Sequence, residues 1–131
     1  MTREEQADLV RRHYALGAAG DHAAARELLT DDFVITIPDF MPFGGTYRGK
    51  DAFLELIPKV RAMAAVAAIK PIATSFGSDH AVEIVEFTLV GYDGPPPQVA
   101  ELIRFRGDRI CEIRPFYSDP HPFMSVTARR G

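Results

Sequence analysis

Residues 98–117, QVAELIRFRGDRICEIRPFY, hold the pattern that decides the fold. Apolar and polar residues largely alternate on both sides of the pair Gly107-Asp108, and such a pair is typical of a tight turn. The segment therefore predicts an antiparallel hairpin of two strands, over residues 98–106 and 109–117.

Three more strands and three helices are predicted before this hairpin. Residues 66–75 and 81–92 have strand-like apolar patterns, and DGPPP at residues 93–97 suits a hairpin connection. Thr2 and Glu5 form a capping box that opens a helix. The remaining elements are that helix over about residues 3–18, a shorter helix capped by Asp21 and running to Leu29, a strand over residues 33–37, and a third helix after Gly49.

The order of these elements indicates the fold class. Helices followed by an antiparallel meander predict an α+β fold, and the 131 residues suit a single domain over residues 1–131. From Ser118 to Gly131 no apolar periodicity is visible. We therefore expect a C-terminal arm over about residues 118–131 that is ordered as far as Met124 and frayed beyond it.

Composition and charge argue against several classes of protein. The formal net charge is −3, whereas a broad nucleic-acid-binding surface is normally basic. No apolar run approaches the roughly 18 residues of a membrane span, and the N-terminus is acidic where a secretory signal is basic. The one cysteine, Cys111, has no partner for a disulfide, and no Cys/His cluster has zinc spacing. We expect a cytoplasmic protein without a structural metal that binds neither membranes nor nucleic acid.

Three segments resemble one family, in the same order along the chain. HYALGAAGDHAAARELLTDDFVI (residues 13–35) is similar to the opening helices and first strand of SnoaL-like polyketide cyclases and ketosteroid isomerases. GTYRGKDAFLELI (residues 45–57) resembles the entry to their third helix, and AELIRFRGDRICEIRPFYSDP (residues 100–120) resembles their last hairpin. Nuclear transport factor 2 and limonene epoxide hydrolase share this fold, which hosts enzymes, binding modules and dimerisation domains.

The resemblance implies a cone, in which a strongly curved antiparallel sheet wraps around a long N-terminal helix. A pocket for a small, largely apolar molecule would lie between the concave face of the sheet and the helices. The resemblance also implies a homodimer, and the outward row of the last hairpin is a candidate partner surface: Leu102, Arg104, Arg106, Glu112 and Arg114.

Glu101 is the first candidate for chemistry. Alternation places it on the same strand face as Val99 and Ile103, and an acid in such apolar surroundings has a raised pKa. Aligning the pair Arg104-Phe105 with the family places Glu101 where ketosteroid isomerases hold the acid of their oxyanion hole, which burial keeps neutral. Alternatively, a shift of one residue in register would turn Glu101 outward to pair with an arginine.

Asp39, His13 and Tyr14 are further candidates. Asp39 lies near the position of the isomerases' catalytic base, which itself aligns with Ile37, and Asp39 could instead cap the turn after Pro38. His13 aligns with their catalytic tyrosine and could act as a base, or be a hydrogen-bonded core residue. Tyr14 lies about 100° further round the helix, and the sequence leaves open which of the two faces the pocket.

The lining of the pocket is also open to alternatives. The loop DFMPFGG at residues 39–45 supplies Phe40, Met41 and Phe43, either as an entrance wall or as a plug that leaves no room for a ligand. On the last hairpin, Ile103 and Tyr117 are candidate ligand contacts. Glu83 and Glu86 lie on opposite faces of their strand, so at most one of them points inward.

The hypothesis that these residues favour is a cofactor-independent isomerase or cyclase that moves a proton on a small apolar carbonyl compound. Asp39 or His13 would be the base, and Glu101 or Tyr117 would stabilise the enolate oxygen. The alternative is a non-catalytic binding or dimerisation module. An epoxide hydrolase is disfavoured, because Pro115 stands where limonene-epoxide-hydrolase-like enzymes carry a catalytic aspartate.

Overall fold

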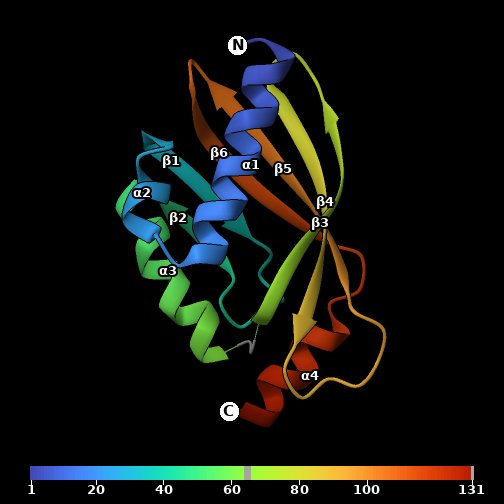
Figure 1. Cartoon of the computed structure of the whole chain (residues 1–131). Helices are drawn as coiled ribbons and strands as arrows, with labels where there is room; N and C mark the ends of the chain where they lie inside the picture. The colour runs from blue at the N-terminus through green and yellow to red at the C-terminus, as the bar shows by residue number, and fades with distance from the viewer. Residues whose placement is uncertain (64–65, 131) are drawn as a thin grey trace.

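The computed structural model describes residues 1–63 and 66–130. Figure 1 shows the order of the elements along the chain, with the N-terminus and the C-terminus at opposite ends of the molecule. The helices are α1 (Arg3–Ala19), α2 (His22–Arg26), α3 (Lys50–Met63) and α4 (His121–Arg130), and the strands are β1 (Leu29–Ile37), β2 (Gly45–Arg48), β3 (Val66–Phe76), β4 (His80–Leu89), β5 (Gln98–Arg106) and β6 (Arg109–Tyr117).

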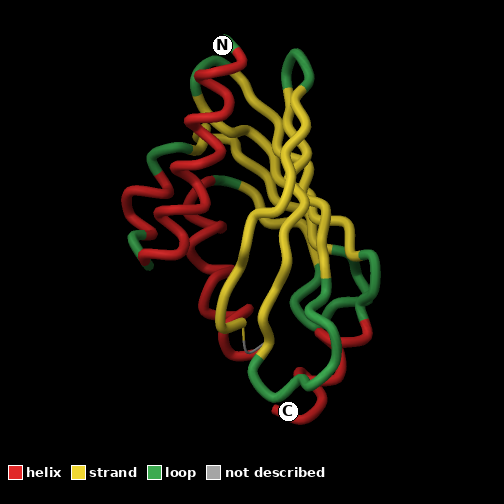
Figure 2. Tube along the Cα trace, turned by 45° about the vertical axis from the view of Figure 1, so that its right-hand side comes forward, coloured by secondary structure: helices red, strands yellow, loops and turns green. Residues whose placement is uncertain are grey.

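The strands form one sheet in the order β2-β1-β6-β5-β4-β3. β1 and β6 run parallel, and the other neighbouring pairs in the described chain are antiparallel. The long strands bend along their length (Figure 2), and α1 lies across the concave face of the sheet (Figure 1). The predicted α+β fold, with a curved sheet around the N-terminal helix, is confirmed.

Irregular pairing between strands contributes to the bend. The register shifts between Pro71 and Ala73 in β3, and between Arg104 and Phe105 in β5. An extra residue on one strand of a pair bends that strand and increases its twist. Pro71 lies on β3, an edge strand, where its missing N–H group is tolerated.

Local contacts fix α1 against the sheet. Its predicted capping box is present: the Thr2 hydroxyl accepts from the Glu5 N–H, and the Glu5 carboxylate accepts from the Thr2 N–H, each at 3.1 Å. Gln6 is buried, and its Nε2 donates to the carbonyls of Gly77 and Ser78, each at 3.2 Å. The side chain of Gln6 therefore ties the start of α1 to the turn between β3 and β4.

The region after α1 departs from the prediction. Asp21 caps α2 as expected, but β1 begins at Leu29 rather than at Phe33. Leu29 pairs with Ile110 of β6, and the Ile110 N–H donates to the carbonyl of Leu28 at 2.9 Å, so the chain joins the sheet earlier than its apolar pattern indicates. The short strand β2 was not predicted, because few residues give little alternation to recognise.

The C-terminal segment also differs from the predicted arm, because it forms the helix α4. Phe123 and Val126 are both buried, and a spacing of three residues places them on one side of that helix. The Phe123 ring makes edge contacts with Phe87 and Tyr117, with centroids 5.2 and 5.1 Å apart. Packing against β4 and β6 therefore holds a segment whose own apolar pattern is too short to indicate a helix.

Shortening Phe123 tests whether α4 belongs to the folded core. We expect Phe123→Ala to lower the free energy of unfolding by about 3–5 kcal/mol, as large-to-small changes in a core do. Met124→Ala is the matched control, since this neighbouring side chain is 42% exposed, and a change within about 0.5 kcal/mol is expected. Urea denaturation measures both. Equal, small effects would mean that α4 contributes nothing to the core.

Candidate functional site

A row of polar side chains crosses the concave face of the sheet. Thr74 of β3 pairs directly with Glu83 of β4, and Glu83 pairs directly with Glu101 of β5. On β6 the position paired with Glu101 is held by Pro115, so the polar row ends at β5. Side chains at directly paired positions of neighbouring strands point to the same face and lie close together. The sheet therefore holds two carboxyl groups side by side.

Apolar residues flank this row on both sides. On one side Ala81 pairs with Ile103, which pairs in turn with Ile113, and all three are buried. On the other side Val85 pairs with Val99, and both are buried. The carboxyl groups therefore lie in surroundings that disfavour negative charge.

Helix α1 brings a phenol to this row. The Tyr14 hydroxyl donates a hydrogen bond to Oε1 of Glu101 at 2.7 Å. Burial raises the pKa of Tyr14, and the charge of Glu101 raises it further, so the phenol keeps its proton and remains a donor. Tyr14 and Glu101 are 87 residues apart in the sequence, and only the packing of α1 on the sheet joins them.

The pKa of Glu101 is raised, chiefly by burial. The negative charge of Glu83 raises it as well, whereas the hydrogen bond from Tyr14 acts in the opposite direction. A carboxyl group held in this way keeps its proton to a higher pH than an exposed one and can donate a hydrogen bond.

Glu83 is the other acid of the row. Its residue is 3% exposed, and the Thr74 hydroxyl donates a hydrogen bond to its Oε2. Burial raises the pKa of Glu83, and the hydrogen bond from Thr74 opposes that shift. Of the two glutamates on β4, Glu83 is therefore the one on the concave face, which the sequence left open.

His13 lies next to Tyr14 but in a different environment. Its ring centroid is 5.0 Å from that of Tyr14 and 6.2 Å from that of Phe53 on α3. Burial lowers the pKa of His13 to about 4, so the imidazole is neutral at physiological pH. Its Nδ1 is buried and has no hydrogen-bond partner among the described residues.

Tyr117 faces the same interior from β6. Its ring packs edge-on against Phe123 at 5.1 Å and against Phe40 at 6.2 Å. Burial raises the pKa of Tyr117, and the charge of Glu101 adds to that effect. Tyr117 therefore lies within electrostatic range of Glu101 while its ring forms part of an aromatic cluster.

The loop between β1 and β2 divides between surface and core. Asp39 is exposed, in a turn closed by the Met41 N–H donating to the Pro38 carbonyl at 3.0 Å. Phe40 is 52% exposed, whereas Met41 and Phe43 are buried in the core. The structure thus groups Tyr14 and Glu101 by a hydrogen bond, with His13 and Tyr117 beside them, and leaves Asp39 at the surface.

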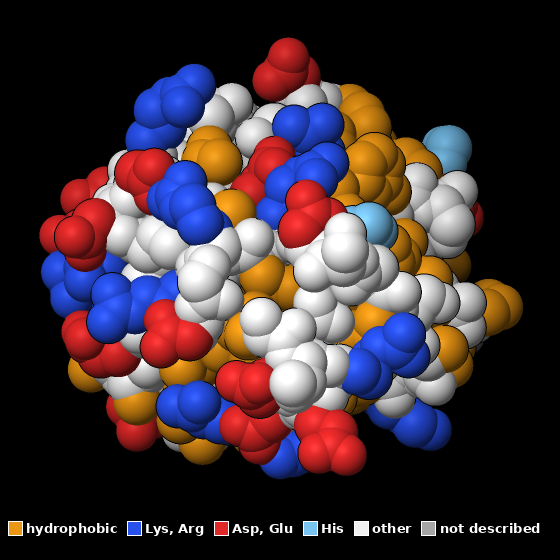
Figure 3. Space-filling model, turned by 90° about the horizontal axis from the view of Figure 1, so that it is seen from above, with side chains coloured by type: hydrophobic (Ala, Val, Ile, Leu, Met, Phe, Trp, Pro, Cys, Tyr) orange, Lys and Arg blue, Asp and Glu red, His pale blue; other side chains and the backbone are white. Residues whose placement is uncertain are grey.

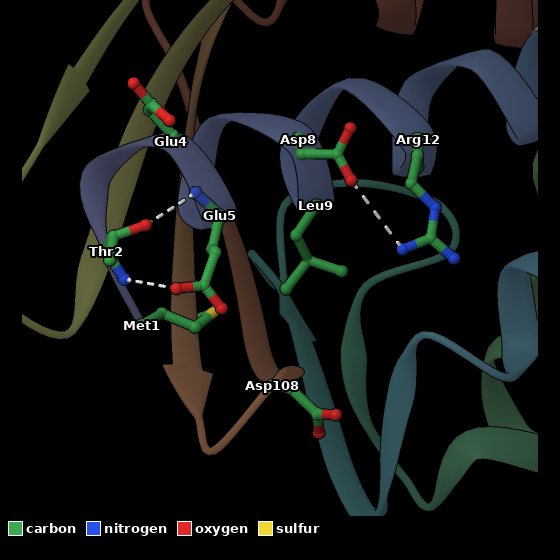
Figure 4. Close-up of a pocket in the computed structure, with 8 residues that line it drawn as sticks. All are labelled: Met1, Thr2, Glu4, Glu5, Asp8, Leu9, Arg12 and Asp108. Carbon is green, nitrogen blue, oxygen red and sulfur yellow. Dashed lines mark hydrogen bonds and ion pairs between the residues drawn. The ribbon is translucent and has the colours of Figure 1, made fainter.

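Two surface hollows are found on the described part of the chain, and one of them reaches the polar group at Tyr117. One, of about 400 Å³, is mainly apolar and is lined by Thr36, Pro38, Phe40, Arg114, Pro115, Phe116 and Tyr117. The other, of about 550 Å³, surrounds the start of α1 (Figure 4). Four of the side chains drawn there already serve the helix, because Thr2 and Glu5 form its capping box and Asp8 pairs with Arg12 at 3.9 Å.

The surface seen from the N-terminal end mixes charges of both signs (Figure 3). The ion pairs of the described chain include Lys50 with Asp31 at 2.9 Å and Arg106 with Asp32. No helix in the described chain is both long and apolar enough to span a membrane.

The comparison with protein families decides the relationship of the chain. Residues 10–113 match the model of the SnoaL-like domain. The chain belongs to the SnoaL-like domain family. The match includes Tyr14, Glu83 and Glu101, the residues of the polar group, and confirms the resemblance that the three segments indicate. No curated protein sequence matches the chain.

Solved structures agree with the fold of a SnoaL-like domain. Bal32a, from a soil-derived mobile gene cassette, superposes with a TM-score of 0.83 at 18% identity, over 95% of this chain and 97% of its own. An NTF2-like protein of unknown function from Burkholderia pseudomallei gives 0.81 at 19% identity, over 97% and 98%. A protein from Sinorhizobium meliloti named "putative polyketide cyclase" gives 0.70 at 17% identity, over 83% and 94%. At these identities the likeness concerns the fold alone.

The raised pKa of Glu101 predicts how stability depends on pH. The folded protein binds the proton of the Glu101 carboxyl group more tightly than the unfolded chain does. The stabilisation that this bound proton provides is therefore complete below the unfolded pKa of about 4.3 and is lost as pH rises through the folded pKa. Glu101→Gln removes that loss. We expect the variant to gain stability relative to the wild type between pH 4 and 8, by about 1.4 kcal/mol for each unit of pKa elevation.

Urea unfolding at several pH values measures this gain. Glu55→Gln, at an exposed position of α3, is the control and should show no such trend. A stability difference between Glu101→Gln and wild type that stays constant with pH would contradict a raised pKa at this position.

Proposed function

We propose that this SnoaL-like domain is a cofactor-independent isomerase or cyclase acting on a small, mostly apolar carbonyl compound. The observation that carries the proposal is the Tyr14–Glu101 hydrogen bond of 2.7 Å, in which a phenol and a carboxyl group of raised pKa meet between α1 and the sheet. In enolisation a proton leaves carbon while negative charge develops on the carbonyl oxygen. A hydrogen-bond donor at that oxygen, such as a protonated carboxyl group, stabilises the charge.

Protonated Glu101 would donate to the carbonyl oxygen and stabilise the enolate, with Tyr14 hydrogen-bonded behind it. For the base, the sequence offers Asp39 and His13, and of these His13 lies beside Tyr14. Its imidazole is neutral, as a general base must be, and Nδ1 is unpaired among the described residues, although the burial that lowers its pKa opposes the charge that an accepted proton would bring. The enolate would then be reprotonated at another carbon in an isomerisation, or attack a second carbonyl in a cyclisation. The Sinorhizobium meliloti neighbour named "putative polyketide cyclase" shares only the fold, and its name agrees with this class.

Replacing Glu101 tests the proposed chemistry. We expect Glu101→Gln to slow proton exchange at the α-carbon of an accepted ketone by about 10²–10⁴-fold, as loss of a general acid or base does. Tyr14→Phe should slow it less, since it removes only the hydrogen bond to Glu101. NMR in D₂O, with a panel of enolisable apolar ketones, follows deuterium uptake. Glu86→Gln on the same strand is the control, and both test variants exchanging at the wild-type rate would overturn the proposal.

A non-catalytic binding module is the second candidate. It is favoured by the burial of Met41 and Phe43, which fill part of the interior that an enzyme would leave for substrate. Native mass spectrometry of the purified protein separates the two candidates when combined with the exchange assay. A retained small molecule without exchange of any ketone indicates binding alone.

We propose further that the convex face of the sheet packs against a second copy of the chain. Ile84 pairs with Ala100 and Ala100 with Phe116, so apolar side chains cross the outer face of three strands. The outer face of an antiparallel sheet is normally polar where it meets water, yet Phe116 is 53% exposed. Arg104 and Arg114 flank Glu112 on the same face and offer charges of both signs to a symmetric partner.

A charge placed in this apolar row should separate the two copies. We expect wild-type protein to sediment as a dimer and Phe116→Arg to sediment as a monomer, because two-fold symmetry would bury the new charge twice. Val90→Arg, at a position 62% exposed beyond the end of β4, is the control and should stay dimeric. Sedimentation velocity gives the result, and a monomeric wild type would refute the proposed interface.

A further inference from the structure

Glu83 and Glu101 occupy facing positions on two neighbouring strands, which brings a second acid to the proposed site. Their Cα atoms are direct partners in the β4–β5 ladder, and such partners have Cβ atoms about 4.5–5.5 Å apart. Two carboxylates so close in an apolar setting do not both ionise readily, because each charge opposes the other. At neutral pH the arrangement therefore favours one proton shared by two acids.

The two acids have different hydrogen-bond partners. Glu83 accepts from the Thr74 hydroxyl of β3, and Glu101 accepts from the Tyr14 phenol of α1. Glu83 lies next to the edge strand β3, while Glu101 lies one strand further into the sheet, between β4 and β6. Both acids accept from a hydroxyl, and Glu83 is itself only 3% exposed, so the difference between them is position: Glu83 lies one strand nearer the edge of the sheet, and we place the negative charge there.

The groups that face the pair from each packed element do not neutralise it. From α1 come Tyr14 and the neutral His13, from β3 comes Thr74, and from β6 comes Tyr117. Among the side chains that the structure describes, neither glutamate has a Lys or Arg partner in an ion pair. The charge of one acid therefore acts on the other without a compensating cation.

We propose that Glu83 and Glu101 form one proton-sharing pair, in which Glu83 holds the negative charge and thereby keeps on Glu101 the proton that is presented to a bound carbonyl oxygen. Glu83 is thus a positioning residue for the proposed enolisation, and the inference rests on that proposed function. The charge of Glu83 raises the pKa of Glu101, which is the direction that this assignment requires.

The titration of Glu101 tests the pair without any substrate. In protein labelled with ¹³C at the glutamate carboxyl carbons, the Glu101 signal is assigned by its absence in Glu101→Gln. We expect Glu83→Gln to lower the titration midpoint of Glu101 by on the order of one pH unit or more, since it removes a like charge at close range. Glu86→Gln, on the opposite face of β4, should leave the midpoint unchanged.

Two outcomes would overturn the pair. One is a Glu101 midpoint that is the same in Glu83→Gln as in the wild type. The other is a wild-type titration in which Glu101 ionises at lower pH than Glu83. The titration uses ligand-free protein, so it can show the expected shift of the Glu101 midpoint even when no ketone exchanges. That result would contradict the proposed enzymatic function but support the proton-sharing pair.

If a ketone is accepted, the pH profile of exchange gives a second readout. Glu83→Gln should move the alkaline fall in rate to lower pH by the same interval as the Glu101 midpoint. A merely structural effect of Glu83 would lower the rate at every pH and leave the profile in place. Urea unfolding of Glu83→Gln confirms that the variant is folded over the range used.

Discussion

The hydrogen bond between Tyr14 and Glu101 depends on two independent alignments, and it holds both in place. Glu101 reaches the interior only in the observed register of β5, because a slip of one residue would turn its side chain to the convex face. Tyr14 reaches Glu101 only at one rotation of α1, since neighbouring residues on a helix differ by about 100°. A buried acid without a partner costs free energy, so the fold is least costly when both alignments are correct.

Much of the architecture was predictable because it depends on local chemistry. The capping box at Thr2 and Glu5 and the turn at Gly107-Asp108 are read from side chains that act on their own backbone neighbours. The inward side of β5 followed from alternation, since Arg104 and Arg106 mark its outer face and Ile103 its inner face. The predictions agree with the structure at these places, where neighbouring residues in the sequence determine the local conformation.

The site was less predictable because it depends on distant contacts. His13 and Tyr14 both lie on the apolar side of α1, and only the angle at which α1 crosses the sheet decides which of them meets Glu101. The pairing of Glu83 with Glu101 depends on a register set across the connection at residues 90–97, whose length gives no fixed offset. The same holds for α4, which is stabilised by packing against Phe87 and Tyr117 rather than by its own pattern.

The sequence of β4 did not show which of its two glutamates faces the interior, and the reason is informative. Its two faces are both apolar, with Ala81 and Val85 on the inside and Val82 and Ile84 on the outside, so alternation could not distinguish Glu83 from Glu86. A strand that meets water on one side normally has a polar outer face. Apolar residues on both faces of β4 are what a strand between two buried layers would carry. Because both faces of β4 are apolar, alternation could not identify Glu83, and the same property supports a second copy on the convex face. The proposed site and the proposed interface would therefore share the strands β4 and β5.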